Sequence, residues 1–359
     1  MKEGSNIPVR NVFYMLAYAF GSLRQGEYRN LATEDFEHVH DLLAAVLALG
    51  LGRQLKQGLK REYMEVREET VSLRGKLDVA GTVAARLSRR RSVVCSYDEL
   101  SEDNAANRAI KAAGMLLVRH GTVDERRRLA LLRDLACLQS VGHVDLRQVR
   151  WDSFRWSRMS LGYRTLLSVC QMIAEGMLLT NEAGELRIAE FIDDQHLYRL
   201  FEKFVLNYYR EEHRWLNAGA PHIPWAIDDG PKELLPTMRS DITLSLGNRV
   251  LIIDTKFYEH TLHVYHGARS VISGNLYQIF TYVKNREALF ADAPHEVSGM
   301  LLYARTNEEV QPDQSYLMSG NRIEVRTLDL SSEFEDIASA LDAIAYRFFG
   351  NGKSGFHGP

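Results

Sequence analysis

The sequence lacks most features of secreted, membrane-spanning and disulfide-stabilised proteins. Its three cysteines, Cys95, Cys137 and Cys170, are isolated and odd in number, so we expect neither a disulfide framework nor a zinc site built from cysteines. No apolar run approaches the roughly 18 residues that span a bilayer, and the first residues lack the basic and apolar segments of a signal peptide. We therefore expect a cytoplasmic protein that makes no contact with a membrane.

An overall excess of positive charge is also missing. The 359 residues include 44 Lys and Arg against 47 Asp and Glu, a net charge of -3. Residues 1–150 hold 24 basic and 19 acidic side chains, a net of +5, which leaves 20 and 28, a net of -8, for residues 151–359. Basic runs at 86–91 and 126–128 fit either contact with nucleic acid or an acidic partner, or a solvated helix face. Because DNA-binding surfaces are usually basic, an acidic domain that acts on DNA would need help from a partner.

Length and periodicity predict two domains with proper cores, the first mainly helical with a small sheet. A polar, glycine-containing break at 181–185 divides the chain into residues 1–183, residues 184–350 and a flexible tail at 351–359. In the first region we expect helices over 9–24, 34–57, 103–120, 124–140 and 160–179 and a strand over 62–73. The helix over 103–120 is expected to begin at an acidic cap.

The second region is predicted to be a mixed sheet flanked by helices, in the α+β or α/β class. The expected elements are a helix over 195–214, strands over 240–246 and 249–257, a helix over 271–289, strands over 297–304 and 322–329, and a helix over 332–348. This order brings a hairpin to the middle of the region.

That hairpin, residues 240–256, is expected to gather the chemically active side chains. The glycine and asparagine at 247–248 lie between two alternating runs and predict a two-residue turn, so paired residue numbers should sum to 495. Asp241 then lies opposite Asp254. Because side chains alternate along a strand, Lys256 shares the face of both aspartates.

Two opposed carboxylates repel each other unless something compensates their charge. A divalent cation such as Mg²⁺, which prefers oxygen ligands, is the natural compensation. Asp241 and Asp254 are therefore predicted metal ligands, and Lys256 is predicted to orient or deprotonate an attacking water. Glu202, on the preceding helix, is either a further acidic ligand or a solvated glutamate.

The order Asp, spacer, Asp-x-Lys resembles the core motif of the PD-(D/E)xK nuclease superfamily, with Ser240 in place of the usual proline. A surface hairpin with scattered charges is the alternative. Gln278 and Tyr282 lie one helical turn apart on the following helix. They match a Gln-x-x-x-Tyr pattern that flanks the metal site or contacts DNA in many members of the superfamily, although a half-buried structural helix would also explain them.

Longer segments resemble the McrC family: IPVRNVFYMLAYAF at 7–20, YDELSEDNAANRAIK at 97–111, MRSDIT at 238–243 and IDTKFY at 253–258. The resemblance covers nearly the whole chain in the family's order. It implies the nuclease subunit of an McrBC (type IV) restriction system, which cleaves double-stranded DNA containing modified cytosine such as 5-methylcytosine. It also implies a partner, McrB, a hexameric AAA+ GTPase ring that recognises the modified site. The N-terminal region would dock into that ring and stimulate GTP hydrolysis.

The resulting mechanism is metal-dependent phosphodiester hydrolysis. Asp241 and Asp254 hold Mg²⁺ or Mn²⁺, with the backbone carbonyl of Thr255 and Glu202 as further ligands, and Lys256 positions the water. GTP is expected to bind the partner only, because the Gly-Lys-Ser at 352–354 lacks the rest of a phosphate-binding loop. A nuclease of repair or stand-alone defence, and a non-cleaving subunit for assembly and GTPase stimulation, remain the alternatives. Which N-terminal residue reaches the GTPase site stays open.

Overall fold

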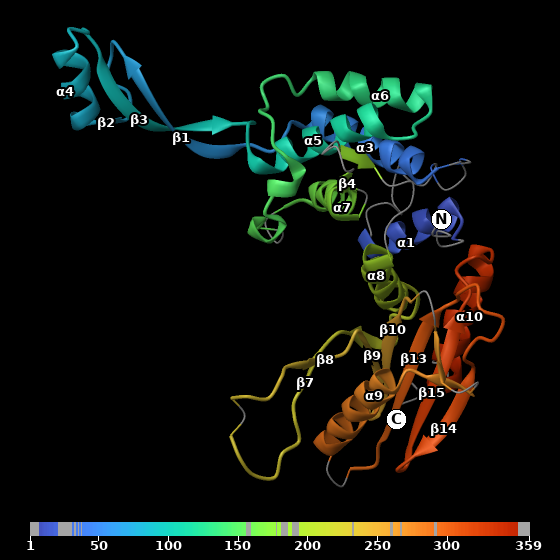
Figure 1. The fold of residues 1–359 in the computed structure, drawn as a ribbon. Coiled ribbons are helices and arrows are strands. Elements are labelled where there is room, and N and C mark those ends of the chain that lie inside the picture. The colour runs from blue at the N-terminus through green and yellow to red at the C-terminus, as the bar shows by residue number, and fades with distance from the viewer. Residues whose placement is uncertain are drawn as a thin grey trace, which may run out of the picture. The chain divides into compact units, whose positions relative to one another are not determined.

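The computed structural model describes residues 7–20, 31, 34, 36, 38–155, 159–176, 178–180, 186–188, 194–231, 233–258, 261–265, 268–290 and 293–350. By its internal contacts the chain splits into two compact units, residues 40–190 and residues 1–39 with 191–359 (Figure 1). The predicted boundary after residue 183 and the predicted tail at 351–359 lie outside the described residues. None of the helices in the described part of the chain is long and apolar enough to cross a membrane.

The unit of residues 40–190 has a helical body. The body contains α3 (Val39–Gln57), α5 (Ala105–His120), α6 (Glu125–Ala136), α7 (Leu161–Gly176), the 3₁₀ turns η2 (Leu146–Gln148) and η3 (Trp151–Ser153), and the strand pair β4 (Leu178–Thr180) and β5 (Leu186–Ile188). Helix α5 contacts both α6 and α7. It approaches α6 so closely at Gly114 that a Cβ there would lie 2.8 Å from the Leu135 side chain. The four helices predicted in this stretch are confirmed, with ends shifted by a few residues.

The expected acidic cap of α5 is wrong. The N-cap is Asn104, which has an extended backbone and accepts a hydrogen bond from the backbone N–H of Asn107. Asp103 instead accepts two hydrogen bonds from the Arg108 guanidinium, at 2.6 and 2.8 Å, and one from the N–H of Gly142 at 2.7 Å. The carboxylate of Asp103 is thus paired with Arg108 and Gly142, whereas the side chain of Asn104 caps the helix.

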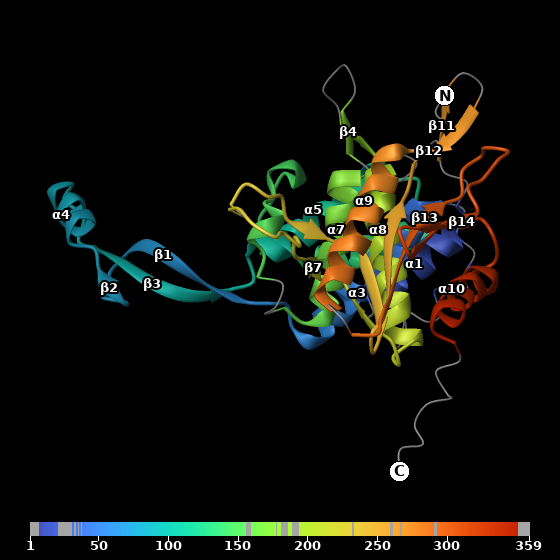
Figure 2. The ribbon, with the colours of Figure 1, turned by 90° about the horizontal axis from the view of Figure 1, so that it is seen from below.

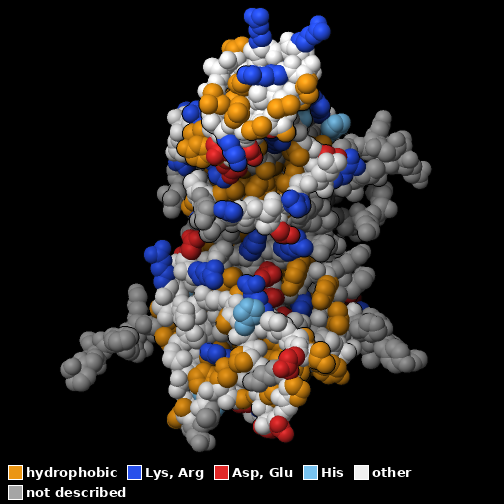
Figure 3. Space-filling view, turned by 90° about the vertical axis from the view of Figure 1, so that its left-hand side faces the viewer, with side chains coloured by type: hydrophobic (Ala, Val, Ile, Leu, Met, Phe, Trp, Pro, Cys, Tyr) orange, Lys and Arg blue, Asp and Glu red, His pale blue; other side chains and the backbone are white. Residues whose placement is uncertain are grey.

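An arm projects from this body (Figures 1 and 2). It comprises β1 (Glu62–Thr70), β2 (Lys76–Leu77), α4 (Val79–Leu87) and β3 (Val93–Ser101). β3 pairs antiparallel with both β1 and β2, and α4 packs Thr82 and Ala85 onto the sheet. Figure 3 looks onto the tip of the arm, where hydrophobic side chains lie between Lys and Arg. The strand predicted from residue 62 is confirmed as far as Thr70, whereas α4 and β3 were not predicted.

The other unit is built on a six-stranded sheet with strand order β14-β15-β13-β10-β9-β6. Its elements are α1 (Val9–Phe20), α8 (Asp194–Glu212), β6 (Asn217–Gly219), β7 (His222–Ile223), β8 (Met238–Arg239), β9 (Ile242–Leu246), β10 (Arg249–Lys256), β11 (Leu262–Tyr265), β12 (Ala268–Val271), α9 (Ser273–Glu287), η5 (Ala288–Phe290), β13 (Glu296–Ala304), β14 (Gln314–Met318), β15 (Asn321–Leu328) and α10 (Phe334–Phe349). β10, β13 and β15 are parallel, and the other neighbours are antiparallel. The predicted mixed sheet flanked by helices is confirmed.

Helix α9 covers one face of this sheet, where Ile252, Ile279 and Leu301 share a buried apolar core. Glycine at 299 is required there, because a Cβ would lie 2.8 Å from side-chain atoms of both Ile279 and Val283. Strand residues of the opposite parity, such as Leu251, are also fully buried, and α8 contacts this part of the sheet at β9 and β10.

The first helix packs with the sheet unit, a difference from the predicted division by chain order. The Asn11 amide donates hydrogen bonds to the carbonyls of Leu330 and Ser332, both at 2.8 Å. Tyr14 stacks on Phe334 with ring centroids 4.1 Å apart. These contacts bury the aromatic face of α1 against α8 and the start of α10.

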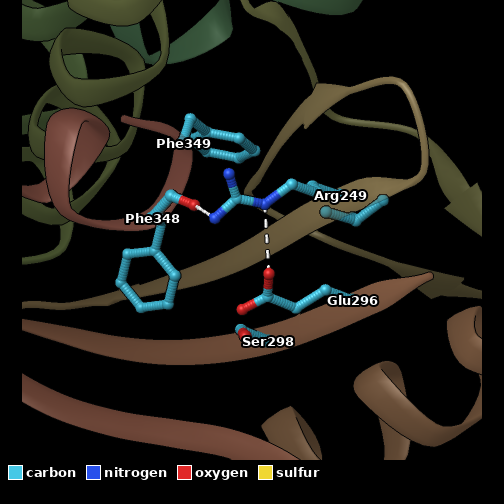
Figure 4. A pocket seen from close by; sticks show the side chains of 6 residues that line it. Arg249, Glu296, Ser298, Phe348 and Phe349 are labelled. Carbon is cyan, nitrogen blue, oxygen red and sulfur yellow. Dashed lines mark hydrogen bonds and ion pairs between the residues drawn. The ribbon is translucent and has the colours of Figure 1, made fainter. Parts of the chain in front are cut away.

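The end of α10 is fixed to the start of the hairpin strand β10 (Figure 4). Arg249 donates to Glu296 at 3.0 Å and to the carbonyl of Phe348, and its guanidinium lies 5.8 Å from the ring centroid of Phe349. One arginine thus joins β10, β13 and the last turn of the C-terminal helix, which supports the strand that carries the candidate site.

Candidate active site

The β9–β10 hairpin has the register that its turn predicts. The ladder pairs Leu246 with Arg249 and continues to Ile242 with Ile253, and every pair sums to 495. Gly247 adopts a positive φ of 58°, which a two-residue turn requires and a glycine tolerates. The strand predicted over 240–246 begins at Ile242, so Asp241 lies one residue beyond the ladder.

Asp241 turns toward the neighbouring strand. Its Oδ2 atom accepts hydrogen bonds from the backbone N–H of Thr255 at 2.8 Å and from the Thr255 hydroxyl at 2.9 Å. The hydroxyl of Tyr198 lies 3.4 Å from the same oxygen. All three contacts fall on Oδ2, which leaves Oδ1 without a hydrogen bond from the described residues.

Asp254 and Lys256 are both buried on β10, and their charged atoms meet. Lys256 Nζ lies 2.6 Å from Asp254 Oδ2, an oxygen to which no described group donates a well-oriented hydrogen bond. Burial, together with the charge of Asp241, raises the pKa of Asp254 from 3.8 to about 6, although the Lys256 ammonium partly opposes the shift. Burial lowers the pKa of Lys256, but the attraction of Asp254 outweighs it and the net shift is upward.

Gln278 and Tyr282 reach this pair from α9. Lys256 Nζ donates a hydrogen bond to Gln278 Oε1 at 3.2 Å, and Gln278 Nε2 donates to the Tyr282 hydroxyl at 2.9 Å. A continuous polar chain therefore runs from Asp254 through Lys256 to Tyr282. The two helix residues singled out in the sequence do lie beside the lysine, while their roles stay predictions.

Glu202 lies on the α8 side of the site. Burial raises its pKa, Asp241 adds to the shift, and the nearby cations Arg239 and Lys203 oppose it. Among the described residues, no three His, Cys, Asp or Glu side chains lie close enough together to hold a metal ion. The structure thus places Asp241 close enough to Asp254 and to Glu202 to raise the pKa of both. The three carboxylates do not form one group that could hold a metal ion.

Tyr198 was not predicted from the sequence. It lies one turn before Glu202 on α8, and burial followed by the charge of Asp241 raises its pKa. The spacing of four residues between Tyr198 and Glu202 was the available signal, because residues one turn apart share a helix face.

The residues present fit a divalent cation. Two carboxylates lie in a partly buried site, one with an unshared oxygen and the other with a buried oxygen that lacks a well-oriented donor. Burial and the nearby charge of Asp241 raise the pKa of Asp254 and so disfavour its negative charge, although Lys256 partly opposes them. Hard oxygen ligands and unmet negative charge are what Mg²⁺ and Mn²⁺ require.

A second candidate surface lies on the arm. Val79, Val83 and Leu87 follow one another at intervals of four along α4, and their exposed fractions are 65%, 52% and 81%. Val71 and Leu73 in the preceding loop are also exposed, at 89% and 66%. Large apolar side chains gathered in the open on a small element mark an interaction surface (Figure 3). The sequence pattern had not singled them out.

Comparison with known proteins extends over nearly the whole chain. A family model described as McrBC 5-methylcytosine restriction system component matches residues 2–304. The "Type IV methyl-directed restriction enzyme EcoKMcrBC" of Escherichia coli (strain K12) is 26% identical over 339 residues, which cover 93% of this chain and 96% of that protein.

Among solved structures, the refined half-complex from the tetradecameric assembly of Thermococcus gammatolerans McrB AAA+ hexamers with bound McrC contains a similar chain. The TM-score is 0.51 at 18% sequence identity, and the match covers 94% of this chain and 76% of that chain. At this low identity the likeness shows the fold alone.

Proposed function

The chain belongs to the family of McrBC 5-methylcytosine restriction system components, and from this premise we propose that it is the DNA-cleaving, McrC-type subunit of such a system. The proposed reaction is metal-dependent hydrolysis of a phosphodiester bond in double-stranded DNA that carries modified cytosine. The named activity of the Escherichia coli relative, a methyl-directed restriction enzyme, supports this choice of substrate.

The observation that carries the proposal is a buried Asp-x-Lys on a central strand, with a second carboxylate fixed beside it. Asp254 and Lys256 form a buried ion pair, in which the cost of removing both charges from water can exceed their attraction, so the pair suggests a role beyond stability. Asp241 and Asp254 would hold the metal, with the Thr255 carbonyl as a further oxygen ligand and the Glu202 carboxylate adding negative charge nearby. A PD-(D/E)xK type of nuclease is the class that this set supports best.

Lys256 is the group proposed to act on the attacking water. Asp254 and Gln278 hold its ammonium between them, which orients it toward the carboxylates and keeps it protonated. In that position it can align a water and balance charge that accumulates on the phosphate. A bound Mg²⁺ or Mn²⁺ supplies Lewis-acid activation of the phosphate and lowers the pKa of a bound water.

The arm is the part proposed to dock onto the GTPase partner. A solved structure with the same fold is described as McrC bound to McrB AAA+ hexamers, and the arm carries the exposed apolar stripe of α4. Burying a Val or Leu side chain contributes roughly 1.5 to 3 kcal/mol, so Val79, Val83 and Leu87 offer on the order of 5 kcal/mol before the costs of association. GTP would bind the partner, and docking of the arm would stimulate its hydrolysis.

The test is cleavage of methylated and unmethylated plasmid by the full-length chain with Mg²⁺ or a chelator, with and without the partner GTPase and GTP. The proposal requires cleavage of methylated DNA that depends on Mg²⁺, partner and GTP and is absent from Asp254→Ala. Cleavage without partner or GTP would identify a self-sufficient nuclease instead. Stimulated GTP hydrolysis without any cleavage would leave an assembly subunit.

A further inference from the structure

The root of the arm is tied to the helical body by two buried asparagines. Asn107 Nδ2 donates hydrogen bonds to the carbonyl of Lys60 at 2.9 Å and to that of Glu102 at 2.7 Å. Asn104 Nδ2 donates to the same two carbonyls, at 2.8 and 3.3 Å. Lys60 lies just before β1 and Glu102 just after β3, so both amides join the point where the chain enters the arm to the point where it returns.

Tyr163 of α7 completes this arrangement. Its hydroxyl donates to Asn107 Oδ1 at 2.9 Å and accepts from the backbone N–H of Lys60 at 2.6 Å. The exposed fractions of Asn104, Asn107 and Tyr163 are 1%, 1% and 4%. Buried polar groups that satisfy one another in this way hold a single geometry, because breaking any bond leaves an unpaired group in a low-dielectric setting.

Capping of α5 does not account for the second asparagine. Asn104 alone caps the helix, since its side chain accepts from the N–H of Asn107. The Asn107 amide donates to the carbonyls of Lys60 and Glu102 at the root of the arm, and its oxygen accepts from Tyr163. Its side chain therefore fixes the arm to the body rather than the start of the helix.

The length of the arm makes its root angle important. The nine residues of β1 extend roughly 30 Å at about 3.4 Å per residue, so a swing of about 10° at the root moves the tip by about 5 Å. A displacement of that size breaks any hydrogen bond or close packing that the tip makes. An arm free to swing would also lose more conformational entropy on docking, and preorganisation removes that cost.

We propose that Asn104, Asn107 and Tyr163 form a clamp that sets the direction of the arm and thereby the affinity of the chain for its GTPase partner. The docking part of this inference rests on the proposed function, whereas the clamp itself is a property of the isolated chain. The three side chains are positioning residues: they act through the arm and not on nucleotide or DNA. Loss of the clamp should weaken docking to the partner, while the maximal rate of GTP hydrolysis in the docked complex stays nearly unchanged.

The clamp is tested first on the isolated full-length chain by the distance between two spin labels. Labels at Leu87→Cys on the arm and Leu129→Cys on α6, both exposed leucines of one unit, are placed in a Cys137→Ser background because the other two cysteines are buried. The clamp predicts one narrow distance distribution for the parent and a clearly broader one for Asn107→Ala. An equally narrow distribution in a folded Asn107→Ala protein would overturn it.

The consequence for docking is tested by GTP hydrolysis of the partner at increasing concentrations of unlabelled chain. Asn107→Ala should raise the concentration for half-maximal stimulation at least tenfold and leave the maximal rate within about twofold of wild type. The matched control is Asn321→Ala, a buried asparagine of the sheet unit with its own hydrogen bonds, which should leave that concentration unchanged. A general loss of stability would shift both variants alike and contradict the role of the clamp.

Two further outcomes are decisive. If Asn107→Ala does not fold, Tyr163→Phe removes one hydroxyl only, and it should broaden the distances less and raise the half-maximal concentration about threefold. No change in either quantity would overturn the clamp. If the wild-type chain fails to stimulate the partner, the proposed function fails, and the spin-label distances still decide whether the clamp exists.

Discussion

The β9–β10 hairpin and the arm depart from ordinary burial in opposite ways. Strand β10 of the sheet unit is buried along almost its whole length, including Asp254 and Lys256. Strand β1 of the arm is exposed at most positions, and α4 beside it leaves Val79, Val83 and Leu87 in solvent. The first, the β9–β10 hairpin, buries charge, whereas the arm exposes apolar surface.

Both departures lower stability, and each therefore indicates a function. A hidden charge must be compensated by a partner group or by a raised pKa, which makes it chemically responsive. An exposed apolar stripe forgoes burial free energy until another surface covers it. These features are the reason why we propose chemistry at the β9–β10 hairpin and docking at the arm.

The largest expected effect comes from removing a carboxylate of the first hairpin. Asp241→Ala should lower cleavage by the assembled complex at least about a thousandfold, because one metal ligand and the hydrogen bonds to Thr255 are lost together. GTP hydrolysis by the partner should stay within twofold of wild type. Cleavage and GTP hydrolysis are measured in the same reaction, with Ser245→Ala, further along β9, as control. Retained cleavage by Asp241→Ala would remove the chemistry from this hairpin.

The next effect comes from charging the arm. Val83→Asp with Leu87→Asp should raise the concentration for half-maximal GTPase stimulation roughly a hundredfold, since two buried apolar contacts are worth about 3 kcal/mol or more. Both positions are exposed in the free chain, so the fold should be unaffected. Leu129→Asp on α6, also an exposed leucine, is the matched control. Equal effects of the arm variant and the control would show that α4 is not the docking surface.

A smaller effect is expected from the residues that hold Lys256. Gln278→Ala should slow cleavage about tenfold, because the ammonium loses its hydrogen bond to Gln278 Oε1 and samples other orientations. Tyr282→Phe should slow it less, since it acts through the glutamine. Tyr277→Phe alters an exposed tyrosine of the same helix and should have no effect. Single-turnover cleavage rates distinguish these cases, and a rate unchanged in Gln278→Ala would contradict the assignment.

The sequence predicts the pairing of the β9–β10 hairpin but not every side-chain position at its end. The register of the β9–β10 hairpin follows from a local turn and an alternating pattern, and the structure confirms it down to Ile242 opposite Ile253. Asp241 departs from the pattern because it lies one residue past the ladder, where its carboxylate accepts hydrogen bonds from the N–H and the hydroxyl of Thr255. Local patterns predict pairing but not such side-chain contacts beyond the end of a strand.

The arm was harder to predict than the β9–β10 hairpin, because its apolar side chains are exposed rather than buried in a core. The interval of four between Val79, Val83 and Leu87 is a helical period, but no sequence pattern tells whether such a stripe packs on a core or stays in solvent, as it does on α4. The place of the first helix depends on contacts such as that between Asn11 and Leu330, which are over three hundred residues apart. No local pattern carries that information.

The buried charge of the first hairpin should also affect stability. The pKa of Asp254 is raised from 3.8 to about 6 on folding, so its ionisation opposes folding above that pH, and the penalty disappears as the pH falls below 3.8. Asp254→Asn should therefore stabilise the metal-free protein at pH 8 by up to about 3 kcal/mol. The gain should shrink toward zero near pH 4. Urea unfolding with a chelator at both pH values measures it, and a loss of stability at pH 8 would contradict it.

The smallest effect is expected at the root of the arm. Hydrogen bonds from Arg108, and then from the N–H of Gly142, outweigh desolvation and hold the pKa of Asp103 at about 2 in the folded chain. A lowered carboxyl pKa stabilises the fold above the unfolded value of 3.8 and ceases to do so as the pH falls through 2. Asp103→Asn should cost about 1 kcal/mol at pH 7, after allowance for partial exposure, and only a small fraction of that near pH 2. Urea unfolding at the two pH values decides it, and an equal loss at both would point to packing.

We propose cleavage at the β9–β10 hairpin and docking at the arm. The most direct test of this division is one reaction in which GTP hydrolysis and cleavage of methylated DNA are followed together. It uses the partner GTPase with wild type, Asp254→Ala, or the arm variant Val83→Asp with Leu87→Asp, each at the concentration that gives half-maximal stimulation with wild type. We predict that Asp254→Ala keeps stimulated GTP hydrolysis and loses cleavage, whereas the arm variant loses nearly all of both. Cleavage that survives in Asp254→Ala, or GTP hydrolysis that survives unchanged in the arm variant, would contradict it.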